Sequence, residues 1–277
     1  MNKRIFLLVG MLSLLVLVFI LSSCDHEDLT NNELLDESTF VENVLETVVE
    51  DSELASSETS IATGRFGFGG GTCLTRTIEG SDSDYPMIIT LDYGTSCESS
   101  GEGIITSGKI IITITGDLKE SGTSKTIVFE EFYVNGYQIS GVITHSRESG
   151  NTYRVVVDQG QITSPDGEIA TYESTRTRTQ VSGLDTDTKE DDVFEITGSS
   201  SGVGFDGTVY TKEIVQPLVK RADCRWIVQG FIEKSSGDNN TTYDFGDGTC
   251  DNLALLTENG ETEEIEMNFR AKRRIRR

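Results

Sequence analysis

The feature that most constrains the fold is a long series of short β-type segments that fills the chain from Cys73 onward. Each segment is rich in Ile, Val, Thr, Tyr and Phe, and the turn formers Gly, Asn, Asp and Ser separate one segment from the next. Links such as VNGYQ and SPDGE are typical of tight hairpin turns, and no helical periodicity interrupts the series. Because strands joined by short links pair antiparallel, residues 73–269 are expected to form a meander of about a dozen strands.

An open meander of this length must protect its edges, which it can do as a curved sheet, a half-barrel or a sandwich. The alternation of Ile110, Ile112 and Ile114 indicates that one face is buried. In STRTRTQ, threonines alternate with Arg176 and Arg178, which predicts an exposed strand that is polar on both faces. We therefore predict a mainly β protein with one N-terminal amphipathic helix, and we favour a curved sheet with the helix against it.

The helix is expected over residues 37–62. Apolar residues recur there at helical spacing between acidic ones, and Thr39 and Glu42 are spaced as a capping box. Residues 63–72 are glycine-rich and lack the Lys-Ser/Thr pair of a phosphate-binding loop, so they are interpreted as a linker.

The N-terminus carries an export signal. Lys3 and Arg4 precede a long apolar run, and the run ends in LSSC at Cys24. This ending resembles the lipobox of bacterial lipoproteins, which implies a signal peptide over residues 1–23, a lipid on Cys24 and an acidic tether over 24–36. The membrane would then be a partner through this anchor. The alternative is an ordinary transmembrane anchor, because the apolar run is just long enough to span a bilayer.

The residues after Cys24 bear on its location. An acidic cluster there resembles the surface-export signal of lipoproteins from the Bacteroidota, whereas Asp25 alone also resembles an inner-membrane retention signal of enteric bacteria. We expect a lipid-anchored protein of the outer membrane, on its periplasmic face or on the cell surface.

The strongly negative net charge limits the classes of molecule that the protein can bind. Removing residues 1–23 removes 2 of the 23 basic residues and none of the 46 acidic ones, so the mature net charge is 21 − 46 = −25 over 277 − 23 = 254 residues. Such a surface repels nucleic acid, so no nucleic-acid partner is expected.

The other four cysteines are expected to form two disulfides. CLTRTIEG followed by TLDYGTSC is repeated as CRWIVQG followed by TYDFGDGTC, with separations of 24 and 26 residues between the cysteines. The simplest connectivity is therefore Cys73–Cys97 and Cys224–Cys250, while bridges between the two repeats remain the alternative. The spacing fits no zinc site.

From residue 70 to 267 the chain resembles a family of uncharacterised β-rich lipoproteins of the Bacteroidota. The resemblance is carried by SGKIIITITG, VFEEFYVNGYQISG, YESTRTRTQVSG, DDVFEITG and CRWIVQGFIE followed by YDFGDGTCDN. It implies an exported, β-rich protein and no particular reaction.

Three aspartates, Asp244, Asp247 and Asp251, are weak calcium candidates. They lack the ligand register of an EF-hand loop, and the sister repeat keeps only Asp92. We therefore interpret the stretch as a structural turn and predict no metal site and no cofactor. The acidic loop GLDTDTKEDD, residues 183–192, is interpreted as solvated.

No catalytic constellation is recognisable. The tripeptide DFG lacks the other kinase motifs, and His145, expected at an exposed strand end, has no G-x-S-x-G partner motif. Trp226 is expected to pack beside a disulfide, and the basic tail 270–277 to be solvated or to touch phosphates or a partner.

Two hypotheses for function follow. The first is a non-enzymatic binding or structural module that holds a glycan or an envelope protein on the sheet face. The second is a carrier of a lipid or lipoprotein in a concave sheet.

Overall fold

The computed structural model of the chain describes residues 44, 45, 47–49, 51, 52, 55, 56, 73–81, 84–98, 104–118, 120–186, 188, 190–224 and 226–267. Cys24 and its lipobox, the acidic tether, the linker 63–72, both ends of the predicted helix and the tail 270–277 lie outside these residues.

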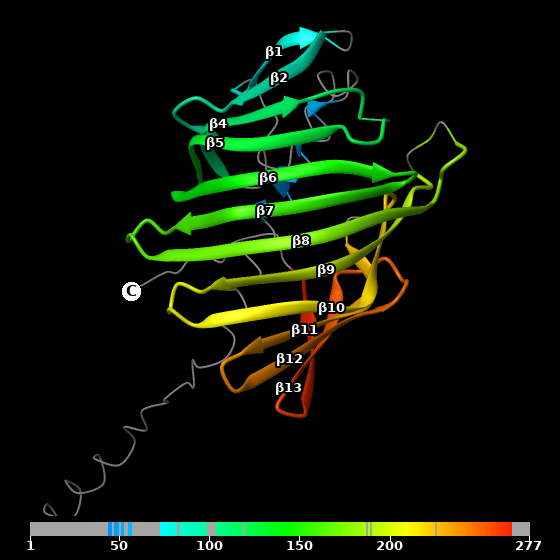
Figure 1. Cartoon of the computed structure of the whole chain (residues 1–277). Helices are drawn as coiled ribbons and strands as arrows, with labels where there is room; N and C mark the ends of the chain where they lie inside the picture. Colours follow the sequence, from blue (N-terminus) through cyan, green and yellow to red (C-terminus); the bar gives the residue numbers. More distant parts are fainter. Residues whose placement is uncertain are drawn as a thin grey trace, which may run out of the picture. The chain divides into compact units, whose positions relative to one another are not determined.

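Fourteen antiparallel strands form one open sheet in the described part of the chain (Figure 1). Their bounds are β1 Thr75–Ser81, β2 Asp84–Asp92, β3 Cys97–Glu98, β4 Ile105–Ile114, β5 Ser124–Val134, β6 Tyr137–Ser149, β7 Thr152–Thr163, β8 Ile169–Ser182, β9 Val193–Val203, β10 Val209–Arg221, β11 Ile227–Ser236, β12 Asn239–Asp247, β13 Leu253–Glu258 and β14 Glu261–Glu266. Apart from the short β3, which pairs with β4, spatial order follows chain order. The predicted antiparallel meander is confirmed, as a single open sheet.

Asn-Gly turns set two of the hairpins. Asn135 and Gly136, with φ of 51° and 85°, join β5 to β6, and Asn259 and Gly260, with φ of 52° and 84°, join β13 to β14. Two consecutive positive φ angles match the right-handed twist of the flanking strands. The hairpin predicted from VNGYQ is therefore present.

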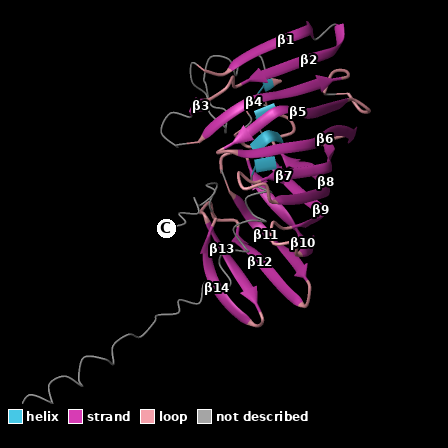
Figure 2. Ribbon diagram, turned by 90° about the vertical axis from the view of Figure 1, so that its left-hand side faces the viewer, coloured by secondary structure: helices cyan, strands magenta, loops and turns pink. Residues whose placement is uncertain are grey.

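Glycines opposite β-bulges bend the sheet. An added Cβ would lie 1.8 Å from the carbonyl oxygen of Glu131 at Gly108 and 2.4 Å from that of Pro217 at Gly230. At Gly141 it would lie 2.9 Å from the carbonyl oxygen of Gln159. Only glycine allows a bulged neighbour to approach this closely, and bulges increase local twist and bending. Three such close approaches, on the pairs β4–β5, β10–β11 and β6–β7, give the curvature seen from the side in Figure 2.

The helical residues lie on the concave side of the curved sheet (Figure 2). Val44, Leu45, Val48 and Val49 are helical and buried in one core cluster with the apolar residues of β2 to β8. We call this side of the sheet the inner face. It is defined by a row of isoleucines that pair across four strands and are fully buried: Ile89, Ile112, Ile127 and Ile143.

The two edges of the sheet are exposed along almost their whole length. At one end, six of the seven residues of β1 are exposed. At the other end β14 has the sequence ETEEIE, in which every residue but the half-buried Ile265 is exposed. Its four glutamates are all solvent-exposed.

The strand containing STRTRTQ differs from its prediction. β8 is a central strand between β7 and β9, and Arg176 and Arg178 are half-buried. The predicted alternation is present, with the arginines on the inner face. The expected exposure was wrong for the arginines, because Arg176 donates to the Tyr172 hydroxyl and Arg178 packs over the ring of Phe194.

Candidate functional site

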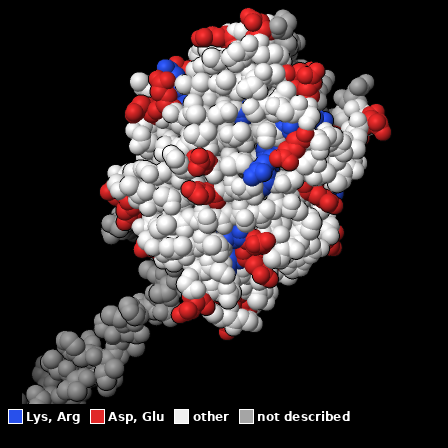
Figure 3. Space-filling model, in the orientation of Figure 1, with Lys and Arg blue, Asp and Glu red and all other residues white. Residues whose placement is uncertain are grey.

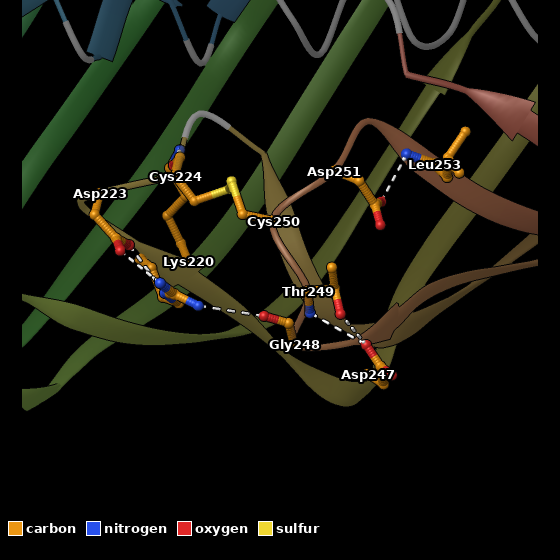
Figure 4. The surroundings of a disulfide bond; sticks show 10 residues. Lys220, Asp223, Cys224, Asp247, Gly248, Thr249, Cys250, Asp251 and Leu253 are labelled. Carbon is orange, nitrogen blue, oxygen red and sulfur yellow. Dashed lines mark hydrogen bonds and ion pairs between the residues drawn. A yellow bond between two sulfur atoms is a disulfide. The ribbon is translucent and has the colours of Figure 1, made fainter.

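The acidic stretch TYDFGDGTCDN begins inside β12 and ends in the turn after it (Figure 4). The prediction of a turn is therefore correct only after Asp247, because Asp244 is paired with Phe231 and Leu255 inside the sheet. The carboxylate of Asp244 accepts the backbone N–H of Gly246 at 2.9 Å, and that of Asp251 accepts the N–H of Leu253 at 3.0 Å. Asp247 accepts both the hydroxyl and the N–H of Thr249, at 2.7 and 3.2 Å.

These bonds assign local roles to the three calcium candidates. Figure 4 shows the carboxyl groups of Asp247 and Asp251 directed at different backbone segments. The hydroxyl and then the amide of Thr249 lower the pKa of Asp247. Within the described residues, no group of three or more His, Cys, Asp and Glu side chains is arranged to hold a metal ion.

The sister repeat makes the same aspartate-to-amide hydrogen bond, at the end of β2 and not inside a strand. Asp92 accepts the N–H of Gly94 at 2.8 Å, as Asp244 does from Gly246. Each unit is closed by a disulfide, and the structure contains the pairs expected from the spacing, Cys73–Cys97 and Cys224–Cys250.

Two further clusters flank the second disulfide and the acidic loop. Arg221 binds the carboxylate of Asp223, whose pKa it lowers, and donates to the carbonyl of Gly248 at 3.3 Å. In the acidic loop, the hydroxyls of Thr186 and Thr188 donate to Asp191 at 2.9 and 3.0 Å and lower its pKa. In both clusters the carboxylate binds side chains only a few residues away in the chain.

His145 lies within β6 and not at its end. It is half-buried on the inner face, where it pairs in register with Lys125 and Val155. Its ring packs against Tyr153, with the ring centroids 5.3 Å apart. The expected exposed strand end was wrong because β6 runs on to Ser149. Trp226 is half-buried two residues after Cys224.

Along the inner face, the residues change from apolar to basic. The isoleucine row continues through Val157, Ser174 and Ser200 to Lys212 and Lys234 on β10 and β11. The basic side chains there lie against aromatic rings. Lys212 and Lys234 approach the ring of Tyr210 within 5.7 and 5.3 Å, which is favourable for a cation.

The opposite side of the sheet, the outer face, carries hydroxyl groups. It is defined by a row of residues that pair in register across β4 to β9: Thr113, Thr126, Thr144, Val156, Thr175 and Ser199. Figure 3 views the molecule from this side and shows acidic side chains in small groups with wide uncharged areas between them.

A groove of about 440 Å³ lies on the outer face across β7 to β10. We call it the outer groove, and its lining residues are Gln159, Gly160, Gln161, Thr171, Glu173, Ser201, Gly202, Val203 and Val209. Gln161, Thr171, Val203 and Val209 are brought together by register, since each pairs with the next across neighbouring strands. In the sequence, only the frequent Thr and Ser residues of these strands point to such a site.

The concave side is occupied where the sheet is apolar. The four isoleucines of the inner face have no exposed surface, and the helical valines are at most 5% exposed. A second, much smaller hollow of about 10 Å³ lies on the basic part of the inner face beside Arg176 and Lys212, with room for about one water molecule.

Of the described residues, none belongs to a helix that is long and apolar enough to cross a membrane. The chain matches no protein-family model, no curated protein and no solved structure.

Proposed function

We propose that the chain is a non-catalytic, lipid-anchored binding module of the cell envelope, most simply of the outer membrane, that holds a glycan in the outer groove. The lipobox-like LSSC at Cys24 supports the anchor. The two disulfides support the location, because such bonds persist in oxidising compartments outside the cytoplasm.

The observation that carries the proposal is the outer groove itself. Its walls present amide, carboxylate and hydroxyl groups from the three neighbouring strands β7, β8 and β9, while Val209 of β10 is 64% exposed at its margin. Sugar rings offer hydroxyls along their edges and apolar C–H groups on their faces, so a polar groove with an apolar margin suits them.

The test uses full-length protein in detergent micelles on an array of immobilised glycans. Ser201 is exposed and lines the groove, so Ser201→Arg would fill it, whereas Thr197→Arg places the same side chain four residues earlier on the same strand and face. We expect Ser201→Arg to abolish binding and Thr197→Arg to preserve it. An array on which the wild type binds nothing, or equal binding by Ser201→Arg, would refute the proposal.

The alternative, a carrier of a hydrophobic ligand, is favoured by one observation: a concave sheet with helical residues on its apolar side. Its ligand would have to displace those residues from the isoleucine row. Native mass spectrometry of protein purified from its own host distinguishes the two roles, because a carrier co-purifies with lipid and we expect none.

A further inference from the structure

The outer groove contains a residue with an unusual backbone conformation. Gln159 lies inside β7 with φ of 53°, in the left-handed region that glycine, asparagine and aspartate adopt far more readily. Non-glycine residues in such conformations persist where the surrounding structure imposes them, and they concentrate at functional sites.

A β-bulge imposes the conformation of Gln159. Val157 pairs with Ser174 and Gly160 pairs with Tyr172, so two residues of β7 stand opposite the single residue Glu173. On the other side, the backbone of Gln159 packs against Gly141, where a Cβ would lie 2.9 Å from its carbonyl oxygen. Bulges of this kind re-aim a side chain.

The bulge brings Gln159 to the groove beside Glu173 and Gln161. Both Gln159 and Glu173 are exposed and line the groove. A glutamine amide can donate and accept at once, and a carboxylate accepts two hydrogen bonds, so the pair can bind neighbouring hydroxyls of one sugar ring. No Lys or Arg lines the groove, and the whole chain carries a net charge of −23. This balance favours an uncharged ligand over a uronic acid or a sulfated sugar.

We propose that Gln159 is a specificity-determining residue of the outer groove, and that its ligand is a neutral glycan with adjacent hydroxyls held between Gln159 and Glu173. This inference rests on the proposed glycan-binding function. The strained backbone is then the structural cost of holding the Gln159 amide in the groove.

One substitution at this position should raise the stability of the fold and weaken ligand binding at the same time. Gln159→Gly relieves the left-handed backbone and removes the amide, so the unfolding midpoint should rise while affinity falls about tenfold, as expected for one or two lost hydrogen bonds. Glu131→Gly is the matched control. Glu131 has φ of 45° in the bulge of β5 and does not line the groove.

The experiment measures both quantities on full-length protein in micelles. The binding probes are immobilised mannan, dextran and galactan, with polygalacturonate as the charged comparison. We expect the wild type to bind a neutral polymer, Gln159→Gly to bind it about tenfold more weakly with a higher unfolding midpoint, and Glu131→Gly to gain stability with unchanged affinity. Equal affinity of Gln159→Gly and the wild type would overturn the role of Gln159 while leaving the proposed function standing. A wild type that prefers polygalacturonate would overturn the neutral ligand, and one that binds none of the four would overturn the proposed function as well.

Discussion

Tyr93 is a buried tyrosine whose hydroxyl has no hydrogen-bond partner among the described residues. The side chain is 1% exposed, and its ring packs against Phe132 with centroids 5.7 Å apart. Burial, and secondarily the nearby Asp51, raises the pKa of the hydroxyl well above its usual value of 10.0. The aligned position of the sister repeat is Phe245, so the motif tolerates the residue without the hydroxyl.

Tyr93→Phe should therefore stabilise the fold. A buried hydroxyl without a partner costs about 1–3 kcal/mol, and part of that gain is offset because the oxygen atom no longer packs against its neighbours, so we expect a net gain of about 1 kcal/mol at pH 7. For a domain of this size that corresponds to a rise of about 2–4 °C in Tm. Urea denaturation followed by fluorescence of Trp226, the only tryptophan, measures the free energy of unfolding.

The pH dependence gives a second measurement. Because the pKa of Tyr93 is higher in the folded protein than in the unfolded chain, the unfolded chain loses the hydroxyl proton at a lower pH. The free energy of unfolding is therefore unaffected below about pH 10 and falls as the pH rises above that value. Tyr93→Phe lacks this loss, so its advantage over the wild type should grow above pH 10. Tyr133→Phe is the control for the gain at pH 7, since the Tyr133 hydroxyl, unlike that of Tyr93, has a partner and donates to Glu131 at 3.3 Å. A Tyr93→Phe protein that is less stable than the wild type at pH 7, or whose advantage is constant with pH, would refute the reasoning.

Two further predictions concern the bend of the sheet and the acidic turn. Gly108→Ala should lower the free energy of unfolding by about 3 kcal/mol or more, because its Cβ would overlap the carbonyl of Glu131. Gly122 also has a positive φ but has no atom within 4 Å of an added Cβ, so Gly122→Ala should cost only about 1 kcal/mol. Equal shifts in Tm for the two variants would contradict the steric argument. Thr249→Val should raise the pKa of Asp247 toward its usual 3.8 in a carboxyl NMR titration, because the variant lacks the hydroxyl that donates to the carboxylate. The carboxylate's contribution to stability is present above pH 3.8 and is lost as the pH falls through the lowered pKa, and this contribution should shrink in the variant. An unchanged pKa, or a resonance shift on adding calcium, would contradict a purely structural role.

The strands, their order and the repeated disulfide-closed unit could be predicted because their signals are local. An Asn-Gly pair such as Asn135-Gly136 specifies its hairpin within a few residues, and an aspartate such as Asp244 binds an amide two residues away. The cysteine separations of 24 and 26 residues were similarly informative, since each pair closes its own unit.

The curvature and the groove could not be predicted because they depend on register between strands. Gly108 bends the sheet only because it stands opposite the bulge at Glu131, and nothing in the local sequence marks that pairing. Likewise, Gln161 and Val203 lie in one groove because both pair with Thr171. The conformation of Gln159 has no sequence signal, since glutamine does not favour a left-handed backbone.

The glutamates of β14 have a consequence for how copies of the protein meet. The last strand of an open sheet offers unpaired backbone groups to any other strand, and a second copy is the commonest one available. Two β14 strands brought side by side would place Glu261, Glu263, Glu264 and Glu266 against an equal set, and like charges directly opposite each other are destabilising. This end of the sheet therefore opposes edge-to-edge pairing of two β14 strands at neutral pH, so the open sheet does not need to close to protect this edge from a second β14.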